Sequence, residues 1–469
     1  MNTMRHVEMT ERRSATAPSR PARESEADFD HPPPLHPLPE STAPATSPAD
    51  PFPLPESPAL PRDRWFDWRW QLRHRIRSVE QLLEYFPGLA DVEPLNRASR
   101  RFPLAITPYY ASLIRSADAT DPIYQMAVPQ VEELCDWPML TEDPLSEEED
   151  SPVPGLIHRY PDRALLIATS ACPVYCRHCT RKRVTGQREG VLAPAELNQA
   201  IAYIRSHPEI RDVIVSGGDP LTLATEVLER ILAALRGIPS VEIIRIGTRS
   251  PVTLPMRITD ELTQMLRRYQ PVYVNTHFNH PSELTAEATR ACLQLADAGI
   301  VLGNQSVLLR GVNDSGPTLE TLFRSLLRIR VRPYYLFQCD LVRGVEHFRT
   351  PLSRGLEIME YLRGRVSGLA IPTFVVDAPH GGGKIPLLPN YILSMSPTHT
   401  VLRNFEGLIV SYPEPSWRNG SVSTPRSDGL EGGVWEVATG RRSCLQPENM
   451  ERQRRRLRHT AGEETDESQ

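Results

Sequence analysis

The sequence predicts an α/β protein built on a partial TIM barrel of the (βα)6 type. Two observations predict this class. Between residues 164 and 377, seven apolar runs of strand length alternate with six amphipathic stretches of helix length, as in βα units on a parallel sheet. Unusual polar residues also follow these runs at the same end, where the carboxyl ends of barrel strands meet. Seven strands rather than eight would leave the barrel partly open.

The elements can be assigned in chain order. The expected strands are residues 164–169, 212–216, 241–247, 272–278, 301–309, 334–338 and 372–377. The expected helices are about 193–206, 224–236, 259–269, 285–298, 317–330 and 353–365. In the second helix, TEVLERILAALRG, apolar residues recur at helical spacing and a glycine follows the last turn. A helix therefore separates each strand from the next.

The chain is expected to have five parts. These are a disordered head (1–62), a helical N-terminal subdomain (63–150), the barrel (151–390), an extension of the core with a possible subunit contact (391–418) and a disordered charged tail (419–469). The head holds fourteen of the 46 prolines and only two aromatic residues, so it cannot bury enough apolar surface to order itself. A docking site for a proline-recognising partner in the head and an RNA-binding arm in the tail are the alternatives to solvated segments.

Within the N-terminal subdomain, Ser78 and Gln81 form a capping-box pattern ahead of VEQLLEYF, and Pro87 with Gly88 ends that helix. The acidic loop TEDPLSEEED (141–150) would form the boundary of the subdomain. These features predict short helices that precede the barrel.

Composition excludes several classes of protein. Lys and Arg number 53 against 58 Asp and Glu, so bulk charge gives no support for nucleic-acid binding. No window approaches 18 consecutive apolar residues, and the first residues lack the apolar segment of a secretory signal, so we expect a cytoplasmic protein without a membrane partner. Seven cysteines in 469 residues, an odd number, argue against a disulfide framework.

Three of the cysteines lie within eight residues, after the first expected strand. Cys172, Cys176 and Cys179 have the spacing C-x3-C-x2-C. Three thiolates leave one iron of a [4Fe–4S] cluster without a protein ligand and open to a small molecule. A zinc site completed by His178 or by a distant cysteine is the alternative. Three further cysteines, Cys135, Cys292 and Cys339, are expected to be small buried apolar residues.

The remaining strand ends also carry polar residues. They are SGGDP (216–220), Arg249, His277, Asn304 with Gln305, Asp340, and Asp377 followed by GGGK (381–384). GGGK is not a P-loop, because Ala378 and Ile385 stand where that motif needs Gly and Ser or Thr. A lysine presented there by flexible backbone could form a Schiff base with pyridoxal phosphate, or it could be an ordinary loop lysine.

Together these motifs resemble the lysine 2,3-aminomutase family of the radical S-adenosylmethionine superfamily. The matching segments run from about residue 95 to 416 and include HRYPDR (158–163), CPVYCRHCTRKR (172–183), VSGGDPL, RIGTRSPV, VNTHFNHP, LGNQSVLLRGVND, FQCDLVRGVEHFRTP and VVDAPHGGGKIP. The resemblance implies a radical S-adenosylmethionine barrel with a pyridoxal phosphate site. It implies an isomerase that moves the α-amino group of L-lysine to the β-carbon and so yields β-lysine.

The resemblance also implies a role for each matched residue. Cys172, Cys176 and Cys179 would ligate the [4Fe–4S] cluster. S-adenosylmethionine would contact Ser216, Gly217, Gly218, Asp219, His277 and Gln305. The catalytic Lys384 would hold pyridoxal 5′-phosphate, with Arg159, Tyr160 and Arg163 around that cofactor. Arg181 would face the substrate carboxylate, and Asp340 and Asp377 would receive the ε-ammonium group of lysine.

The aspartate pair has a physical basis of its own. Two carboxylates at neighbouring strand ends repel each other and both ionise readily only beside a cation. That cation could be a substrate side chain, or an arginine such as Arg343 or Arg349. The pair does not separate an ammonium from a guanidinium group, so arginine, or a lysine of a protein such as a translation factor, remains an alternative substrate. A non-catalytic iron–sulfur protein on this scaffold is the alternative from another class.

The expected partners are an amino acid substrate, a reducing electron donor of the flavodoxin or ferredoxin type, and further copies of the chain. Some members of the family bind zinc between subunits through a cysteine after the GVND segment and a C-terminal cysteine cluster. Here Ser315 follows Asp314, and Cys444 is the one cysteine beyond Cys339. We therefore expect a homodimer without that zinc site.

Overall fold

The computed structural model describes residues 62–89, 92–186, 188–396 and 399–414. The predicted disordered head, up to residue 61, and the predicted charged tail lie outside the described residues, as does Cys444. Among the described residues, no helix is both long enough and apolar enough to cross a membrane.

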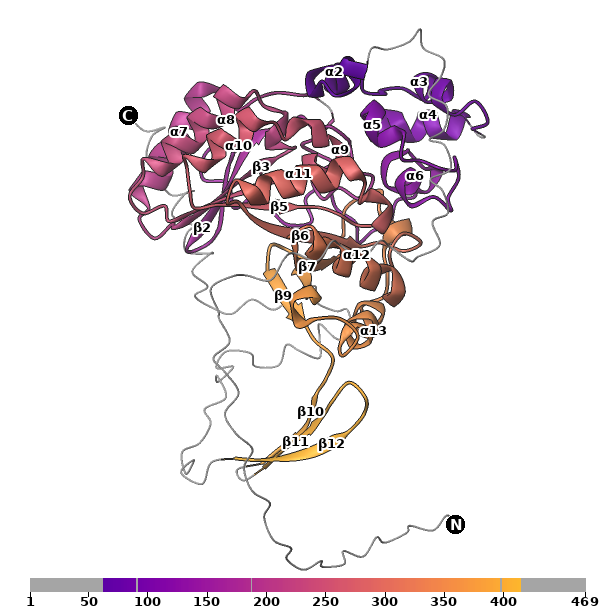
Figure 1. Cartoon of the computed structure of the whole chain (residues 1–469), viewed down its shortest axis with the longest axis vertical. Helices are drawn as coiled ribbons and strands as arrows, with labels where there is room; N and C mark the ends of the chain where they lie inside the picture. The colour runs from indigo at the N-terminus through magenta and orange to yellow at the C-terminus, as the bar shows by residue number, and fades with distance from the viewer. Residues whose placement is uncertain (1–61, 90–91, 187, 397–398, 415–469) are drawn as a thin grey trace, which may run out of the picture. The chain divides into compact units, whose positions relative to one another are not determined.

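A nine-stranded sheet forms the centre of the fold (Figure 1). Its strands pair in chain order: β1 (Leu156–Tyr160), β2 (Arg163–Thr169), β3 (Asp212–Gly217), β4 (Ile243–Gly247), β5 (Val272–Thr276), β6 (Val301–Leu308), β7 (Arg332–Gln338), β8 (Thr373–Ala378) and β9 (Gly383–Leu387). Strands β2 to β8 are parallel, and they are the seven strands that the sequence predicts. The predicted fold class, a partial parallel barrel, is therefore confirmed.

The two edge strands were not predicted. Strand β1 pairs with β2 and strand β9 pairs with β8, both antiparallel. Their sequences, LIHRY and GKIPL, are short and partly polar, so they lack the apolar run that identifies a buried strand. Because β1 and β9 are the ends of the pairing order, the barrel stays open between them.

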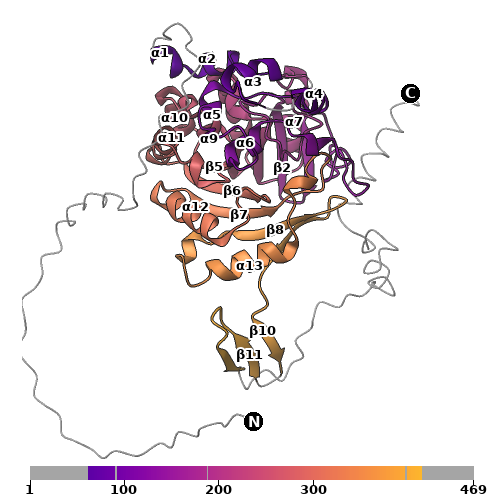
Figure 2. The same ribbon diagram turned by 90° about the vertical axis from the view of Figure 1, so that its right-hand side faces the viewer.

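Six helices connect the parallel strands and cover the outside of the sheet (Figures 1 and 2). They are α7 (Pro194–Ser206), α8 (Thr225–Arg236), α10 (Asp260–Arg267), α11 (Ala286–Asp297), α12 (Gly316–Arg328) and α13 (Leu352–Leu362), with the short α9 (Ser250–Thr253) added after β4. In α8 the buried residues Leu228, Ile231 and Leu235 recur at helical spacing on one face. The apolar face of each helix therefore packs on the strands, as the periodicity predicts.

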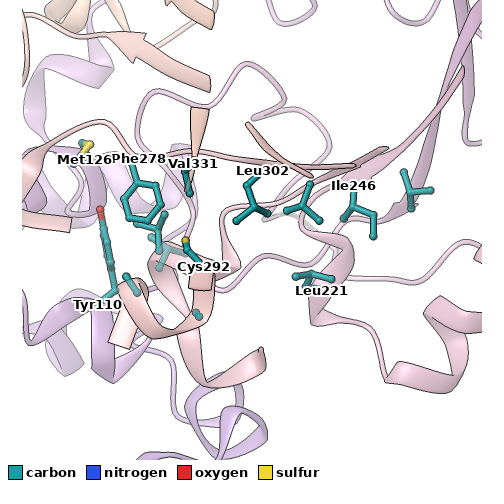
Figure 3. Packing of buried hydrophobic residues seen from close by; sticks show 14 of the residues in the cluster. Tyr110, Met126, Leu221, Ile246, Phe278, Cys292, Leu302 and Val331 are labelled. Atoms are coloured by element: carbon teal, nitrogen blue, oxygen red, sulfur yellow. The ribbon is translucent and has the colours of Figure 1, made fainter. Parts of the chain in front are cut away.

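Short helices precede the barrel. They are α1 (Arg62–Trp65), α2 (Trp68–Arg73), α3 (Val79–Tyr85), α4 (Val92–Arg101), α5 (Pro108–Ala111), α6 (Pro122–Ala127) and the 3-10 helix η1 (Val131–Leu134). The predicted capping of α3 is present, because the Ser78 hydroxyl accepts from the Gln81 amide at 3.2 Å. These helices and the barrel share one apolar core, in which Tyr110 and Met126 lie near Phe278 (Figure 3).

The cysteines outside the C-x3-C-x2-C segment divide into two kinds. Cys292 and Cys339 are buried, as expected. The expectation for Cys135 was wrong, because this residue is exposed just after η1, where the chain leaves the core.

A second, three-stranded antiparallel sheet follows the barrel. It consists of β10 (Ile392–Met395), β11 (His399–Arg403) and β12 (Ile409–Pro413). Every residue of β10 and β12 is exposed, although most of them are apolar. An apolar sheet of this kind normally packs against another surface.

The contact between α13 and β8 fixes the strand that carries Asp377, and Gly355 makes that contact possible. A methyl group at position 355 would lie 2.1 Å from Cζ of Phe374, which is fully buried in β8. Gly355→Ala would gain about 1 kcal/mol of helix propensity, but overpacking costs about 1–3 kcal/mol. We expect a lower midpoint of denaturant unfolding. Gly368→Ala is the control, since no heavy atom lies within 4 Å of that position; equal midpoints for the two variants would contradict this packing.

Candidate active site

The three clustered cysteines line one cavity of about 200 Å³ at the carboxyl end of the barrel strands. Their loop follows β2 and is held from behind by the N-terminal helices. The Tyr175 amide donates to the carbonyl of Ala105 and the Arg177 amide to that of Met126, each at 2.9 Å. The Arg177 guanidinium also donates two 2.8 Å hydrogen bonds to Glu133, and both side chains are buried. The N-terminal helices therefore fix the conformation of the cysteine loop.

The sulfur atoms fit a cationic metal centre. Burial raises the pKa of Cys172 and Cys179, and the nearby cysteines raise both pKa values further. Thiolates that oppose each other's ionisation in a buried cavity need cationic charge between them. Among the described residues, no three Cys, His, Asp or Glu side chains converge closely enough to hold a single metal ion. The buried and mutually repelling thiols therefore suit a cationic metal centre.

The glycine-rich segment lies beside this loop, in contact with its backbone. Gly217 has φ +121°, and a Cβ atom there would lie 2.3 Å from the carbonyl oxygen of Thr169. A Cβ atom on Gly218 would lie 2.3 Å from the carbonyl oxygen of Ala171. The sequence suggested that glycine is needed for close approach of a ligand. The structure gives another reason, which is the close approach of two backbone segments.

Asp219 has a structural task in this segment. Its buried carboxylate accepts from the Thr248 hydroxyl at 2.7 Å and from the Arg249 amide at 2.8 Å. Burial raises its pKa. Asp219 thus ties the end of β3 to the loop after β4, and it lines the cysteine cavity at the same time.

A larger cavity of about 470 Å³ adjoins the first. Of the predicted site residues it is lined by Arg159, Tyr160, Arg163, Arg181, Ser216, His277, Gln305, Asp340, Asp377 and Lys384. The two cavities share a wall made of His178, Thr180, Arg181, Ser216, Gly247, His277 and Val307. Burial, and then the charge of Arg249, lower the pKa of His277 in this wall to about 4. The structure therefore brings the cysteines and Lys384 to neighbouring parts of one site, with His277 between them.

Lys384 is held by the β8–β9 pairing. It lies opposite Asp377 in the antiparallel register, and its Nζ is 3.0 Å from Oδ1 of Asp377. Its backbone amide donates to the Tyr160 hydroxyl at 2.9 Å. The expectation of a lysine on flexible backbone was wrong, because Gly381 and Gly382 form the hairpin turn while Gly383 and Lys384 belong to strand β9. The lysine is thus presented from a fixed strand.

The groups around Lys384 suit a phosphorylated aldehyde cofactor. Gly383 has φ +83°, and a Cβ atom there would lie 2.9 Å from the Tyr160 hydroxyl, so glycine leaves room for this ring. The Arg163 guanidinium lies over the same ring, 5.0 Å from its centroid. Arg159 lines the cavity as well. Two guanidinium groups near a primary amine match the needs of an anionic cofactor that binds through its aldehyde.

Asp340 and Asp377 both line the larger cavity. Asp340 is half-buried after β7 and accepts from the Thr180 hydroxyl at 2.7 Å. Burial, and then the charge of Asp377, raise the pKa of Asp340 to about 6. The alternative cations named from the sequence are engaged elsewhere, since Arg343 pairs with Glu142 and Arg349 with Glu346. The cation beside the aspartates is Lys384 itself.

The acidic loop, which was expected to form the boundary of the N-terminal subdomain, also contributes to the larger cavity. Glu147 is buried and accepts from the Arg181 guanidinium at 2.7 Å. Although burial opposes its ionisation, Arg181 and Arg183 lower the pKa of Glu147 to about 2. Asp150 pairs with Arg159 at 2.9 Å in the same way. The loop therefore supplies the negative charge that allows cavity arginines to be buried.

Further lining residues escaped the sequence analysis. They are Glu147, Arg245, Asn275, Tyr334, Tyr335 and Phe337. Arg245 alternates with Gly247 on β4 and pairs with Asp212 at 2.9 Å. The period-2 alternation of the strands could have identified Arg245, Asn275, Tyr335 and Phe337 as facing the barrel interior. It could not have identified Glu147, which lies in a loop, or Tyr334, which directly precedes Tyr335.

Two family models match this chain. The family model described as Lysine-2,3-aminomutase matches residues 359–469, and that of the Radical SAM superfamily matches residues 166–320. A solved radical SAM methyltransferase from Sphaerobacter thermophilus is 23% identical over 47% of this chain and 68% of its own, with a TM-score of 0.37. That structural overlap is too small to bear on function.

Curated relatives match most of the chain. The L-lysine 2,3-aminomutase of Clostridium subterminale is 52% identical over 84% of this chain and 96% of its own length. The L-lysine 2,3-aminomutase of Bacillus subtilis is 49% identical over 76% of both chains. The glutamate 2,3-aminomutase of Clostridioides difficile is 47% identical over 74% of this chain and 82% of its own. The chain thus belongs to the lysine 2,3-aminomutase family of radical SAM isomerases.

Proposed function

We propose that this protein is a pyridoxal phosphate-dependent L-lysine 2,3-aminomutase that produces β-lysine. The observation that carries the proposal is the shared wall between the cavity of the three cysteines and the cavity of Lys384. When bound there, a [4Fe–4S] cluster with S-adenosylmethionine supplies a hydrogen-abstracting radical, and pyridoxal phosphate supplies an aldehyde that carries the migrating nitrogen. The chain's own contribution is to hold these groups side by side and away from water.

Each residue has a proposed task in this arrangement. The cluster would be ligated by Cys172, Cys176 and Cys179, and S-adenosylmethionine would lie along Ser216, Gly217, Gly218, Asp219, His277 and Gln305. The pyridoxal phosphate would be held by Arg159, Tyr160, Arg163 and Lys384. Arg181 would bind the substrate carboxylate, which would compete there with Glu147 at 2.7 Å.

The small number of lysines in the chain supports Lys384 as the residue that would bind the aldehyde of pyridoxal phosphate. The whole chain contains two lysines, Lys182 and Lys384. Lys182 is buried in an ion pair with Glu133 at 3.1 Å, and burial lowers its pKa. Lys384 alone of the two lines the larger cavity. An aldehyde that enters this cavity therefore meets one amine.

Charge balance supports a cationic substrate. Asp377 is neutralised by Lys384, and any aldehyde that takes up this amine leaves Asp377 and Asp340 facing each other. A substrate side chain with a positive charge would restore the balance. Sequence identity alone does not decide whether the substrate is cationic, because relatives named for lysine and for glutamate have similar identity to this chain.

Two alternatives can be separated by one assay. An arginine 2,3-aminomutase, or an enzyme acting on a lysine of a translation factor, would use the same carboxylates. A non-catalytic iron–sulfur protein would hold the cluster without an aldehyde-reactive Lys384. After anaerobic reconstitution with iron, sulfide and pyridoxal phosphate under a strong reductant, we expect free L-lysine to yield β-lysine and free L-arginine to yield no β-amino acid.

The proposed role of Lys384 predicts a specific covalent adduct and a specific loss. Borohydride reduction in the presence of pyridoxal phosphate should add one pyridoxyl group, which peptide mass spectrometry should find on Lys384. Lys384→Ala should lose this adduct and all aminomutase turnover, while still cleaving S-adenosylmethionine to 5′-deoxyadenosine. Lys182→Arg is the control and should keep the adduct on Lys384. Unchanged turnover in Lys384→Ala would refute the assignment.

The raised pKa of Asp340 predicts how substrate affinity depends on pH. The charged groups that face this carboxyl are Asp377 from β8, Lys384 from β9 and Glu147 from the acidic loop. The pKa of Asp340 is about 6, so this carboxyl is neutral at lower pH and ionised at higher pH. Because the ionised form binds a cation, KM for lysine should fall as pH rises from 5 to 7. Asp340→Asn should raise KM at pH 7.5 roughly 30-fold, or about 2 kcal/mol. A pH-independent KM in the native protein would contradict a role in binding the ammonium group.

We further infer that the chain forms a homo-oligomer through its second sheet. Leu408, Ile409 and Tyr412 lie on or next to β12 and are each 60% exposed. Because successive residues of a strand point to opposite faces, this sheet exposes apolar side chains on both faces, and such a sheet fits a second copy of itself.

This surface can be tested by analytical ultracentrifugation. Ile409→Glu combined with Tyr412→Glu should shift the protein from a dimer toward a monomer. Leu369→Glu is the matched control, because Leu369 is 61% exposed but lies in the isolated 3-10 helix η6 (Gly368–Ala370). A wild-type monomer, or a dimer unaffected by the double substitution, would exclude this interface.

A further inference from the structure

Arg249 has no task in the proposed chemistry, yet it is buried against the cysteine loop. It follows β4, and its Nη1 lies 2.7 Å from Sγ of Cys176. Its Nη2 donates to Glu283 at 2.6 Å and to the Tyr110 hydroxyl at 2.8 Å. The guanidinium therefore joins a cysteine of the loop to a buried carboxylate and to an N-terminal helix.

The position of this guanidinium is fixed from several sides. Glu283 is fully buried and also accepts from the Asn279 amide at 2.6 Å and from the His280 amide at 3.0 Å. The Tyr110 hydroxyl donates to the same carboxylate at 2.8 Å. A buried ion pair costs free energy unless its polar groups are all satisfied, and these bonds satisfy Glu283. A purely structural arginine would need nothing more, but Nη1 is left to point at sulfur.

The main chain of Arg249 reaches the other half of the cysteine cavity. Its amide donates to the Asp219 carboxylate at 2.8 Å, and Asp219 closes the glycine-rich segment after β3. The same residue thus contacts Cys176 with its side chain and the glycine-rich segment with its backbone. A shift of Arg249 would move both.

We propose that Arg249 is a positioning residue that holds Cys176 and raises the reduction potential of the iron–sulfur cluster. The inference rests on the proposed function, because it needs a cluster on Cys172, Cys176 and Cys179. A hydrogen bond to a ligating sulfur withdraws electron density from it and favours the form that has accepted one electron from an external reductant. Glu283 balances the charge of Arg249, so the effect acts through the directed N–H to sulfur bond.

The test measures the midpoint potential of the reconstituted cluster by redox titration followed by electron paramagnetic resonance, with dithionite as reductant. The double variant Arg249→Gln with Glu283→Gln removes the ion pair without leaving a buried charge unpaired. We expect it to keep four irons per chain and to show a more negative midpoint than the wild type. Arg257→Gln is the matched control, since Arg257 is also buried but donates to the carbonyls of Leu221 and Leu223. It should leave the midpoint unchanged.

An unchanged midpoint in the loaded double variant would overturn the inference. If the double variant does not hold four irons, the variant Arg249→Lys provides the test. Lysine keeps a positive charge beside Glu283 but lacks the second donor nitrogen that reaches the Cys176 sulfur. A negative shift in that variant supports the inference, and a midpoint equal to the wild type overturns it. Failure of the wild type itself to take up a cluster would instead refute the proposed function.

Discussion

The parallel register of seven strands is the constraint on which the site depends. Thr169 pairs with Gly217 and Thr276 with Asn304, so the carboxyl ends of neighbouring strands lie at one level. The cysteine loop and the glycine-rich segment start from adjacent strands at that level, and the amide of Gly218 donates back to the Thr169 carbonyl at 2.6 Å. Without this register the two cavities would not share a wall.

The second constraint is electrostatic. The larger cavity is lined by cations that are already paired: Arg159 with Asp150, Arg181 with Glu147, and Lys384 with Asp377. These pairs allow charged groups to remain in a partly buried site. Under the proposed function, ligands would bind by exchanging partners with these pairs. An anionic or cationic ligand that displaced one member of a pair would leave the other available, so the existing pairs would allow recognition of both ends of an amino acid.

Much of the barrel could be predicted because local and global patterns agree. All seven parallel strands and the six long helices follow the apolar periodicity, and α8 ends at Gly237 as its sequence indicates. The edge strands β1 and β9 could not be predicted, because hairpin pairing at an open edge depends on tertiary contacts such as the Tyr160 hydroxyl with the Lys384 amide.

The site could be predicted only where a local sequence pattern indicates the chemistry. Cys172, Cys176 and Cys179 have a spacing that carries chemistry by itself, whereas Glu147 and Asp150 look like any acidic loop until the arginines they neutralise are placed beside them. The exposed position of Cys135 depends on where the chain leaves the core, which composition does not specify. Pairing of charges across the fold is a long-range property, and it was this property that the sequence left open.

The proposed chemistry requires a cluster on the cysteines and an aldehyde on Lys384 in adjoining cavities. The decisive measurement is a crystal structure of the protein reconstituted under anaerobic conditions with iron, sulfide, S-adenosylmethionine and pyridoxal phosphate. We expect a four-iron cluster on Cys172, Cys176 and Cys179, and pyridoxal density continuous with Nζ of Lys384, with the nucleotide beside the shared wall at His277. Pyridoxal phosphate bound elsewhere, or a cluster separated from Lys384 by packed side chains, would contradict it.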